Sequence, residues 1–84
     1  MSSDPRAWRT PHVLWTATLR DRRAQLDMLR LAIGFDLRLF VDEELVRTEL
    51  FPDGHALIEA ATTWRTMMEG KGWLVTVPGA PPGR

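Results

Sequence analysis

The feature that most constrains this fold is a pair of alternating runs followed at once by a helical pattern. Residues 35–41 alternate apolar with polar side chains over most of their length, which is the period of a strand with one buried face. In residues 45–51 the same period puts Val46, Thr48 and Leu50 on one face. A short acidic segment separates the runs, so they are expected to pair as a β-hairpin. On the first run, the inner face is expected to hold Phe35, Leu37, Leu39 and Val41, and the outer face Asp36, Arg38 and Phe40.

The turn of this hairpin can be placed at residues 43–44 or at residues 42–43, and neither option contains the glycine that tight hairpins prefer. The first option pairs Val41 with Val46. The second slides the pairing by two residues and keeps the same face buried. In both cases the second strand is expected to point Val46, Thr48 and Leu50 towards the core, and to leave Leu45, Arg47, Glu49 and Phe51 outside.

A helix is expected over residues 54–69. The sequence Pro52-Asp-Gly54 breaks the preceding strand, and Asp53 is a good N-cap residue. Gly70 and Gly72 lie where the helix should end. One apolar stripe recurs at helical spacing and should pack on the inner face of the hairpin; it consists of Leu57, Ala60, Ala61, Trp64 and Met68.

The part of the chain before the hairpin allows two interpretations. Residues 13–19 are rich in β-branched and aromatic side chains and alternate, which predicts a strand with Trp15 on its apolar face. Residues 20–34 consist of good helix formers, so propensity alone favours a helix there. The same residues also carry turn signals at both ends, with Asp21 at one and Gly34 at the other, which suits a strand between two turns.

Three sets of residues resemble a pattern found in small uncharacterised bacterial proteins. They are Trp15-Thr-Ala-Thr-Leu-Arg20, then Phe35-Asp-Leu-Arg-Leu-Phe-Val-Asp-Glu-Glu-Leu45, then Phe51, Ala56, Ala60, Trp64 and Gly72-Trp73. The pattern spans roughly residues 13–73. It implies a meander of strands followed by one helix, with residues 20–34 as a strand, and it implies no known activity.

The predicted fold is therefore α+β: an antiparallel meander of three to four strands, with one C-terminal helix packed on one face. Residues 73–77 alternate and are expected to form a short last strand at a sheet edge. Residues 12–77 are expected to form the single domain, between a flexible arm at 1–11 and a disordered Pro/Gly-rich tail at 78–84. The predicted core consists of Trp15, Leu37, Leu39, Val46, Leu50, Leu57, Ala60, Ala61, Trp64 and Met68.

Composition excludes several classes of function. The chain has no cysteine, which excludes disulfides and thiol catalysis and fits a cytoplasmic protein. No apolar run approaches the length of a membrane span, so no membrane association is expected. Three ligand-type side chains meet at the predicted helix start, but a capping Asp53, a solvated His55 and a helix-face Glu59 explain them. We expect no catalytic residue, no metal and no cofactor.

The sequence predicts a small non-catalytic accessory or protein-interaction module. Its partner is expected to be a second copy, forming a homodimer, or another protein, because a small sheet covered on one side leaves apolar groups and strand edges open. The alternative is single-stranded nucleic-acid binding, since a meander followed by a helix is the layout of the transcriptional positive cofactor and of Whirly-type single-strand binders. In that alternative the outer face would bind through Arg20, Arg22, Arg23, Arg38, Phe40 and Arg47.

Overall fold

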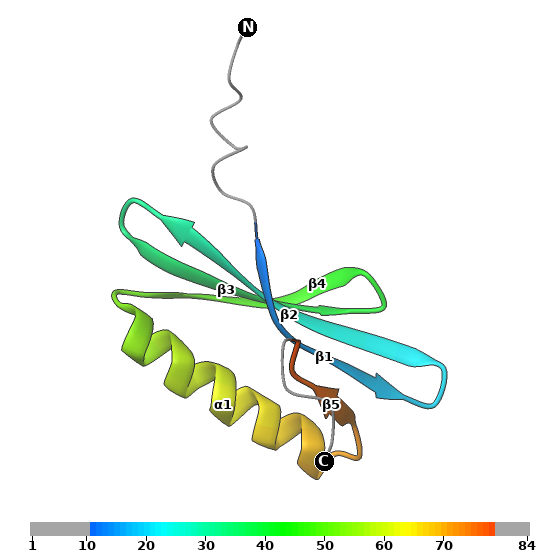
Figure 1. Ribbon diagram of the computed structural model, residues 1–84. Helices are drawn as coiled ribbons and strands as arrows, with labels where there is room; N and C mark the ends of the chain where they lie inside the picture. The colour runs from blue at the N-terminus through cyan, green and yellow to red at the C-terminus, as the bar shows by residue number, and fades with distance from the viewer. Residues whose placement is uncertain (1–10, 79–84) are drawn as a thin grey trace, which may run out of the picture.

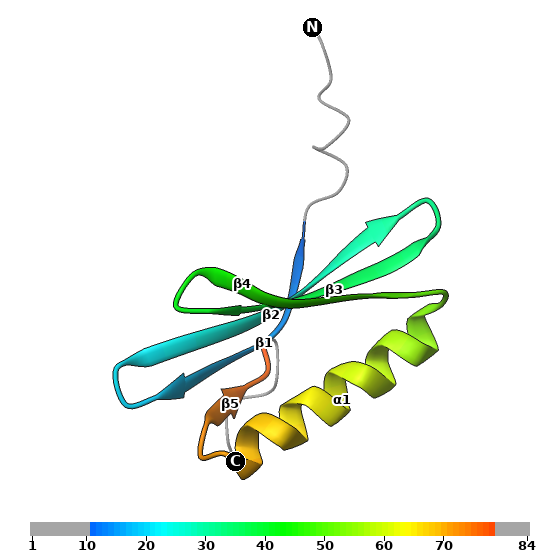
Figure 2. The same cartoon turned by 180° about the vertical axis from the view of Figure 1, so that it is seen from behind.

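The computed structural model describes residues 11–78. One antiparallel sheet of five strands is covered on one side by one helix, and Figures 1 and 2 show the helix running along that side of the twisted sheet. The elements are β1 (His12–Leu19), β2 (Arg22–Leu31), β3 (Gly34–Val41), β4 (Glu44–Phe51), α1 (Gly54–Gly70) and β5 (Leu74–Thr76).

The spatial order of the strands is β4-β3-β2-β1-β5, so the first four strands form a meander and the last strand joins its far edge. β5 runs antiparallel to β1, with Ala17 opposite Val75. This arrangement confirms the predicted α+β fold with a short last strand. It also shows that β1 is paired with β2 on one side and, from Thr16 to Thr18, with β5 on the other.

Residues 22–31 form a strand, as the resemblance implied and against their helix propensity. β2 is paired along its length with β3 and along most of its length with β1. Its alternate residues Ala24 and Leu26 are buried towards the helix. Tertiary pairing on two sides therefore overrides a local preference that amounts to only a few tenths of a kcal/mol per residue.

The turn between β3 and β4 lies at Asp42 and Glu43, the second of the two predicted positions. Both residues have positive φ, at 52° and 70°, which is the backbone of a type I′ turn. This turn favours glycine, and aspartate is one of the few other residues that tolerate it. The left-handed backbone of Asp42 is supported by its N–H, which donates to the carbonyl of Arg23 at 2.7 Å.

Gly34 opens β3 at a place where no other residue fits. Its φ is 147°, outside the range that side-chain-bearing residues adopt, and a Cβ there would lie 2.3 Å from the backbone oxygen of Phe51. The backbone of Phe51 at the end of β4 therefore lies too close to Gly34 for a side chain at that position.

The helix is capped as the sequence predicts and extends one residue further, to Gly70. The Asp53 carboxylate accepts a hydrogen bond from the backbone N–H of Ala56 at 2.8 Å. At the other end, the N–H of Gly72 donates to the carbonyl of Glu69, and Gly72 has a positive φ of 98°. The chain can therefore turn sharply into β5.

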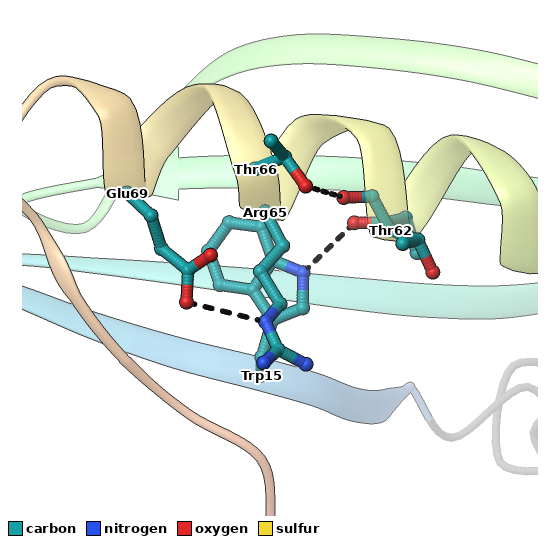
Figure 3. Close-up of polar contacts among 6 residues, drawn as sticks. Trp15, Thr62, Arg65, Thr66 and Glu69 are labelled. Carbon is teal, nitrogen blue, oxygen red and sulfur yellow. Dashed lines mark hydrogen bonds and ion pairs between the residues drawn. The ribbon is translucent and has the colours of Figure 1, made fainter.

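One hydrogen bond joins the sheet to the helix at the centre of the core. The indole Nε1–H of Trp15 donates to the backbone oxygen of Ala61 at 3.2 Å, and Figure 3 shows the Trp15 ring beneath the helix. Both groups are buried, so the bond satisfies a polar group that would otherwise be costly to bury. The buried cluster consists of Trp15, Ala17, Ala24, Leu26, Leu37, Leu39, Leu57, Ala61, Trp64, Met68 and Trp73.

The predicted core needs correction in β4. Val46 and Leu50 were expected inside, but they are 53% and 47% exposed. The cause is a β-bulge: Phe40 pairs with Leu45, while the next residue back on β3, Leu39, pairs with Arg47, so β4 holds one additional residue. A shift of one residue exchanges the two faces of the strand beyond it, and Phe51 therefore lies on the helix side.

The remaining predicted core residues lie under the helix or on it; Ala60 is half-buried, and Trp15, Leu37, Leu39, Leu57, Ala61, Trp64 and Met68 are buried. The arm predicted at residues 1–11 and the tail predicted at residues 78–84 lie outside the described residues, apart from Pro11 and Pro78.

Candidate interaction surface

The side of the sheet away from α1 forms the first candidate surface, which we call the open face. Strand alternation and the pairing registers place side chains from all five strands on it. One row across the sheet runs through the directly paired residues Leu45, Phe40, Gln25, Thr16 and Thr76. The face further includes Thr18, Arg23, Asp27, Asp36, Arg38, Thr48, Leu50 and Leu74.

A hollow of about 340 Å³ lies on the open face at the end near the β1–β2 and β3–β4 turns. Five of the eight described residues that line it have polar side chains, and Phe40 is the one aromatic residue among these eight. It is therefore a surface that offers hydrogen-bonding groups beside one apolar face. The lining residues are Thr16, Ala17, Thr18, Arg23, Ala24, Gln25, Phe40 and Glu43.

The carboxylates of the open face are held by their neighbours in the sheet. Asp36 accepts from the Nε–H of Arg38 at 2.7 Å and from the hydroxyl of Thr48 at 2.7 Å. Asp27 is only 8% exposed and accepts from the amide of Gln25 at 2.8 Å. These hydrogen bonds fix the polar part of the face in one arrangement.

The edge strand β4 forms the second candidate surface. Residues 44–50 are all exposed, and only Phe51 is partly buried. Leu45, Val46 and Leu50 are each about half exposed, at 47%, 53% and 47%. Exposed apolar side chains on an unpaired strand edge are typical of a surface that pairs with another strand.

The structure divides the residues of the nucleic-acid alternative between two faces. Arg23, Arg38 and Phe40 lie on the open face. Arg47 was expected beside Phe40, but the bulge turns it to the helix side, where its guanidinium lies 3.9 Å from the centre of the Trp64 ring. That expectation is therefore wrong for Arg47.

The two remaining residues of that set lie at the β1–β2 hairpin. The guanidinium of Arg22 is 5.8 Å from the centre of the Trp73 ring and forms an ion pair with Asp42 at 3.1 Å. Arg20 lies in the β1–β2 turn with a positive φ of 57°. The six residues therefore do not form one continuous basic surface.

Asp42 links this hairpin to the β3–β4 turn. Its carboxylate accepts from the backbone N–H of Arg23 at 3.0 Å and from the Nε–H of Arg22 at 3.1 Å. The backbone hydrogen bond from Arg23, followed by the side-chain hydrogen bond from Arg22, lowers the pKa of Asp42 below its ordinary value of 3.8.

The acidic and histidine residues at the helix start have structural partners. Asp53 caps the helix, and the His55 imidazole lies 3.2 Å from the Glu59 carboxylate one turn further along. Within residues 11–78, no three histidine or acidic side chains gather closely enough to hold a metal ion. Over the same residues, no helix is both long enough and apolar enough to cross a membrane.

Of the residues that line the hollow, only Arg23 and Phe40 were singled out from the sequence. Thr16 and Thr18 alternate with the buried Trp15 and Ala17, so their outward direction was visible in the pattern. Gln25 lies between them and Phe40 because of the pairing of β2 with both neighbours. Only the sheet order reveals that contact.

Comparisons with known proteins add no relative. No family model matches this sequence, and no curated protein or solved structure is significantly similar to it.

Proposed function

We propose that this chain is a small non-catalytic protein-interaction module of bacterial origin, acting in the cytoplasm. Its binding surface is β4 together with the adjoining part of the open face. The observation that carries the proposal is that residues 44–50 of β4 are all exposed and include three half-exposed aliphatic side chains. In a monomer the side chains and the unpaired backbone groups of this edge face water, whereas an added strand covers both.

The polar groups beside this surface support an interaction role over an acid–base role. Asp36 is hydrogen bonded to Arg38 and Thr48, so its carboxylate is committed to the architecture of the sheet. A fixed polar pattern beside exposed aliphatic groups is the usual composition of a protein interface. The lack of cysteine fits the cytoplasmic location.

Site-specific photo-crosslinking in cells tests the proposal. A photoreactive phenylalanine analogue replaces Leu50 on β4 in one variant and Ile33 in the β2–β3 turn in the matched control. Both positions are exposed, at 47% and 74%. We expect discrete protein adducts from position 50 and none from position 33. No adduct at position 50, or the same adducts at both positions, would reject the proposal.

A second candidate function is single-stranded nucleic-acid binding at the hollow of the open face. The observation that favours it is that Phe40 and Arg23 line the same hollow. An aromatic ring on which a base can stack, beside a guanidinium for the phosphate, is the basic unit of such sites. The neighbouring carboxylates of Asp27 and Asp36 oppose it, because they lie on the same face.

Fluorescence anisotropy with a labelled oligothymidine distinguishes this candidate. If the hollow binds nucleic acid, affinity should fall steeply as salt is raised, and the double substitution of Arg23 and Phe40 by alanine should weaken binding about tenfold or more. Arg65→Ala on the helix serves as the control, because Arg65 lies on the opposite side of the molecule. No binding at low salt would reject this candidate.

A further inference from the structure

The residue order of β4 is self-complementary about Thr48. On either side of this residue lie a basic and an acidic side chain, Arg47 and Glu49, and beyond them two aliphatic ones, Val46 and Leu50. A strand with this order matches an antiparallel copy of itself, because a two-fold axis at Thr48 brings each member of a pair opposite its counterpart.

The geometry of the strand suits such a match. Arg47 and Glu49 lie on the same face, and their charged groups are 3.6 Å apart within the strand. Their side chains remain 46% and 49% exposed, so each can accept a further partner. Arg47 is held in place from below by its stacking on Trp64. The charged pair is therefore positioned at the edge before any partner arrives.

From these observations we propose that the partner of β4 is a second copy of this chain, paired antiparallel through β4 about a two-fold axis at Thr48. In this pairing Arg47 lies opposite Glu49 of the second copy, and Glu49 lies opposite its Arg47. Four alternating charges then surround the axis on the helix side. Val46 lies opposite Leu50 of the second copy, so this pairing covers two of the three half-exposed aliphatic side chains of β4.

The pairing ends at the bulge. Val46 is the additional residue, which has no partner in β3, and it is the last residue of the matched segment from Val46 to Leu50; Leu45 lies beyond it and stays outside. The result is a continuous sheet of two copies, with both helices on the same side because Arg47 and Glu49 share the helix face in each copy. This inference rests on the proposed interaction function and specifies its partner.

A charge exchange tests the pairing. In Arg47→Glu the two like-charged contacts across the axis should raise the dissociation constant of the homodimer about tenfold or more, and Glu49→Arg should do the same. Mixing the two variants places opposite charges at both contacts and should restore the dimer. The double variant with both exchanges should also dimerise. If Arg47 and Glu49 only stabilised the fold of the single chain, mixing the two variants would not restore the dimer.

Light scattering after size exclusion measures these masses. The full chain should give about twice the monomer mass of 9.6 kDa, each single variant should shift towards the monomer, and the mixture should return to the dimer. Circular dichroism verifies that both variants are folded. A monomeric wild-type chain at ~100 μM would reject a dimer of micromolar affinity. Single variants that remain dimeric, or a mixture that stays monomeric, would also overturn the proposed pairing.

The two proposals fail in different ways. If crosslinks from position 50 join the chain to a protein of another mass, the interaction function stands and the second-copy inference falls. If position 50 gives no adduct at all, the interaction function itself falls. Binding of oligothymidine by a monomeric wild-type chain would likewise count against the paired edge and in favour of the hollow.

Discussion

β3 and β4 form one hairpin and have equal length, yet they occupy different environments. β3 buries Leu37 and Leu39 completely or nearly so, at 0% and 9% exposure. β4 leaves seven of its eight residues exposed. The difference arises because β3 lies between two strands and beneath α1, whereas β4 has a neighbour on one side and a bulge near its start.

The comparison teaches that alternation identifies a strand without fixing which face is buried or how deeply. How deeply a strand is buried depends on the elements that cover it, and which of its two faces is buried depends on the pairing register. In β4 a single additional residue brings Arg47 over Trp64 and sends Leu50 to the open face. The long side chain of Arg47 then covers part of the Trp64 ring.

The largest expected effect separates the two strands directly. Leu37→Ala should lower the free energy of unfolding by about 2–5 kcal/mol, because it leaves a cavity at a fully buried site. Leu50→Ala, the same change at a 47% exposed site of β4, should cost less than about 1 kcal/mol. Urea denaturation at dilute concentration, where the monomer dominates, measures both. Equal losses there would contradict the exposure of Leu50 in the single chain.

The second prediction concerns the close approach of Gly34 at the start of β3 to the end of β4. Gly34→Ala puts a Cβ 2.3 Å from the Phe51 carbonyl oxygen and forces a strained φ, so it should cost about 1–3 kcal/mol. Gly70→Ala is the matched control at the end of the helix, where nothing lies within 4 Å. Thermal melts should show a clear loss for the first variant and little change for the second. An unaffected Gly34→Ala would contradict the close approach.

A smaller effect tests whether β4 contributes to the core through Arg47. Arg47→Gln removes the cation that stacks on Trp64 and should destabilise the fold by about 0.5–1 kcal/mol. Arg65→Gln is the control, since it removes an exposed helical ion pair worth about 0.3–0.5 kcal/mol. Denaturation at dilute concentration, where the monomer dominates, provides the comparison. If Arg47→Gln lowers the stability no more than Arg65→Gln does, the contact between Arg47 and Trp64 contributes nothing to the core.

The smallest expected effect is at the turn that joins the strands. The pKa of Asp42 is lowered in the folded protein, so this group stabilises the fold above its ordinary value of 3.8 and loses that contribution as pH falls through the folded pKa. An NMR titration should therefore find a midpoint below 3.8 for the Asp42 carboxyl. The stability difference between wild type and Asp42→Asn should shrink over the same acid range. A midpoint at or above the ordinary value would contradict both hydrogen bonds.

Much of the fold was readable from the sequence because its signals are local. The Asp53 cap, the apolar stripe ending at Met68 and the alternation of β3 each follow from a few neighbouring residues. The strand β2 was predicted from the resemblance and from the turn signals at its two ends, because its composition is that of a helix while its environment is that of a central strand. Propensity is weak against pairing on both sides.

The candidate interaction surface was harder to predict, because the pairing register of β4 with β3 decides which side chains are exposed there. The adjacent apolar residues Leu45 and Val46 interrupt the alternation of β4 at the position of the bulge, and this is the one local signal of the shift. The place of β5 beside β1 depends on the direction in which α1 returns the chain, which no local pattern encodes. Errors at Val46, Leu50 and Arg47 all follow from the bulge.

The short strand β5 limits how far copies of this chain can assemble. A sheet with two long open edges can add a molecule at each and grow into a fibre. Here β5 occupies β1 at Thr16–Thr18, and a bulge at Leu14 distorts the rest of that edge. Among the described strands β4 is the one long open edge, so the proposed pairing through β4 would use it up and leave only the three-residue strand β5 at the other side of the sheet. If the pairing holds, β5 protects this chain from polymerisation.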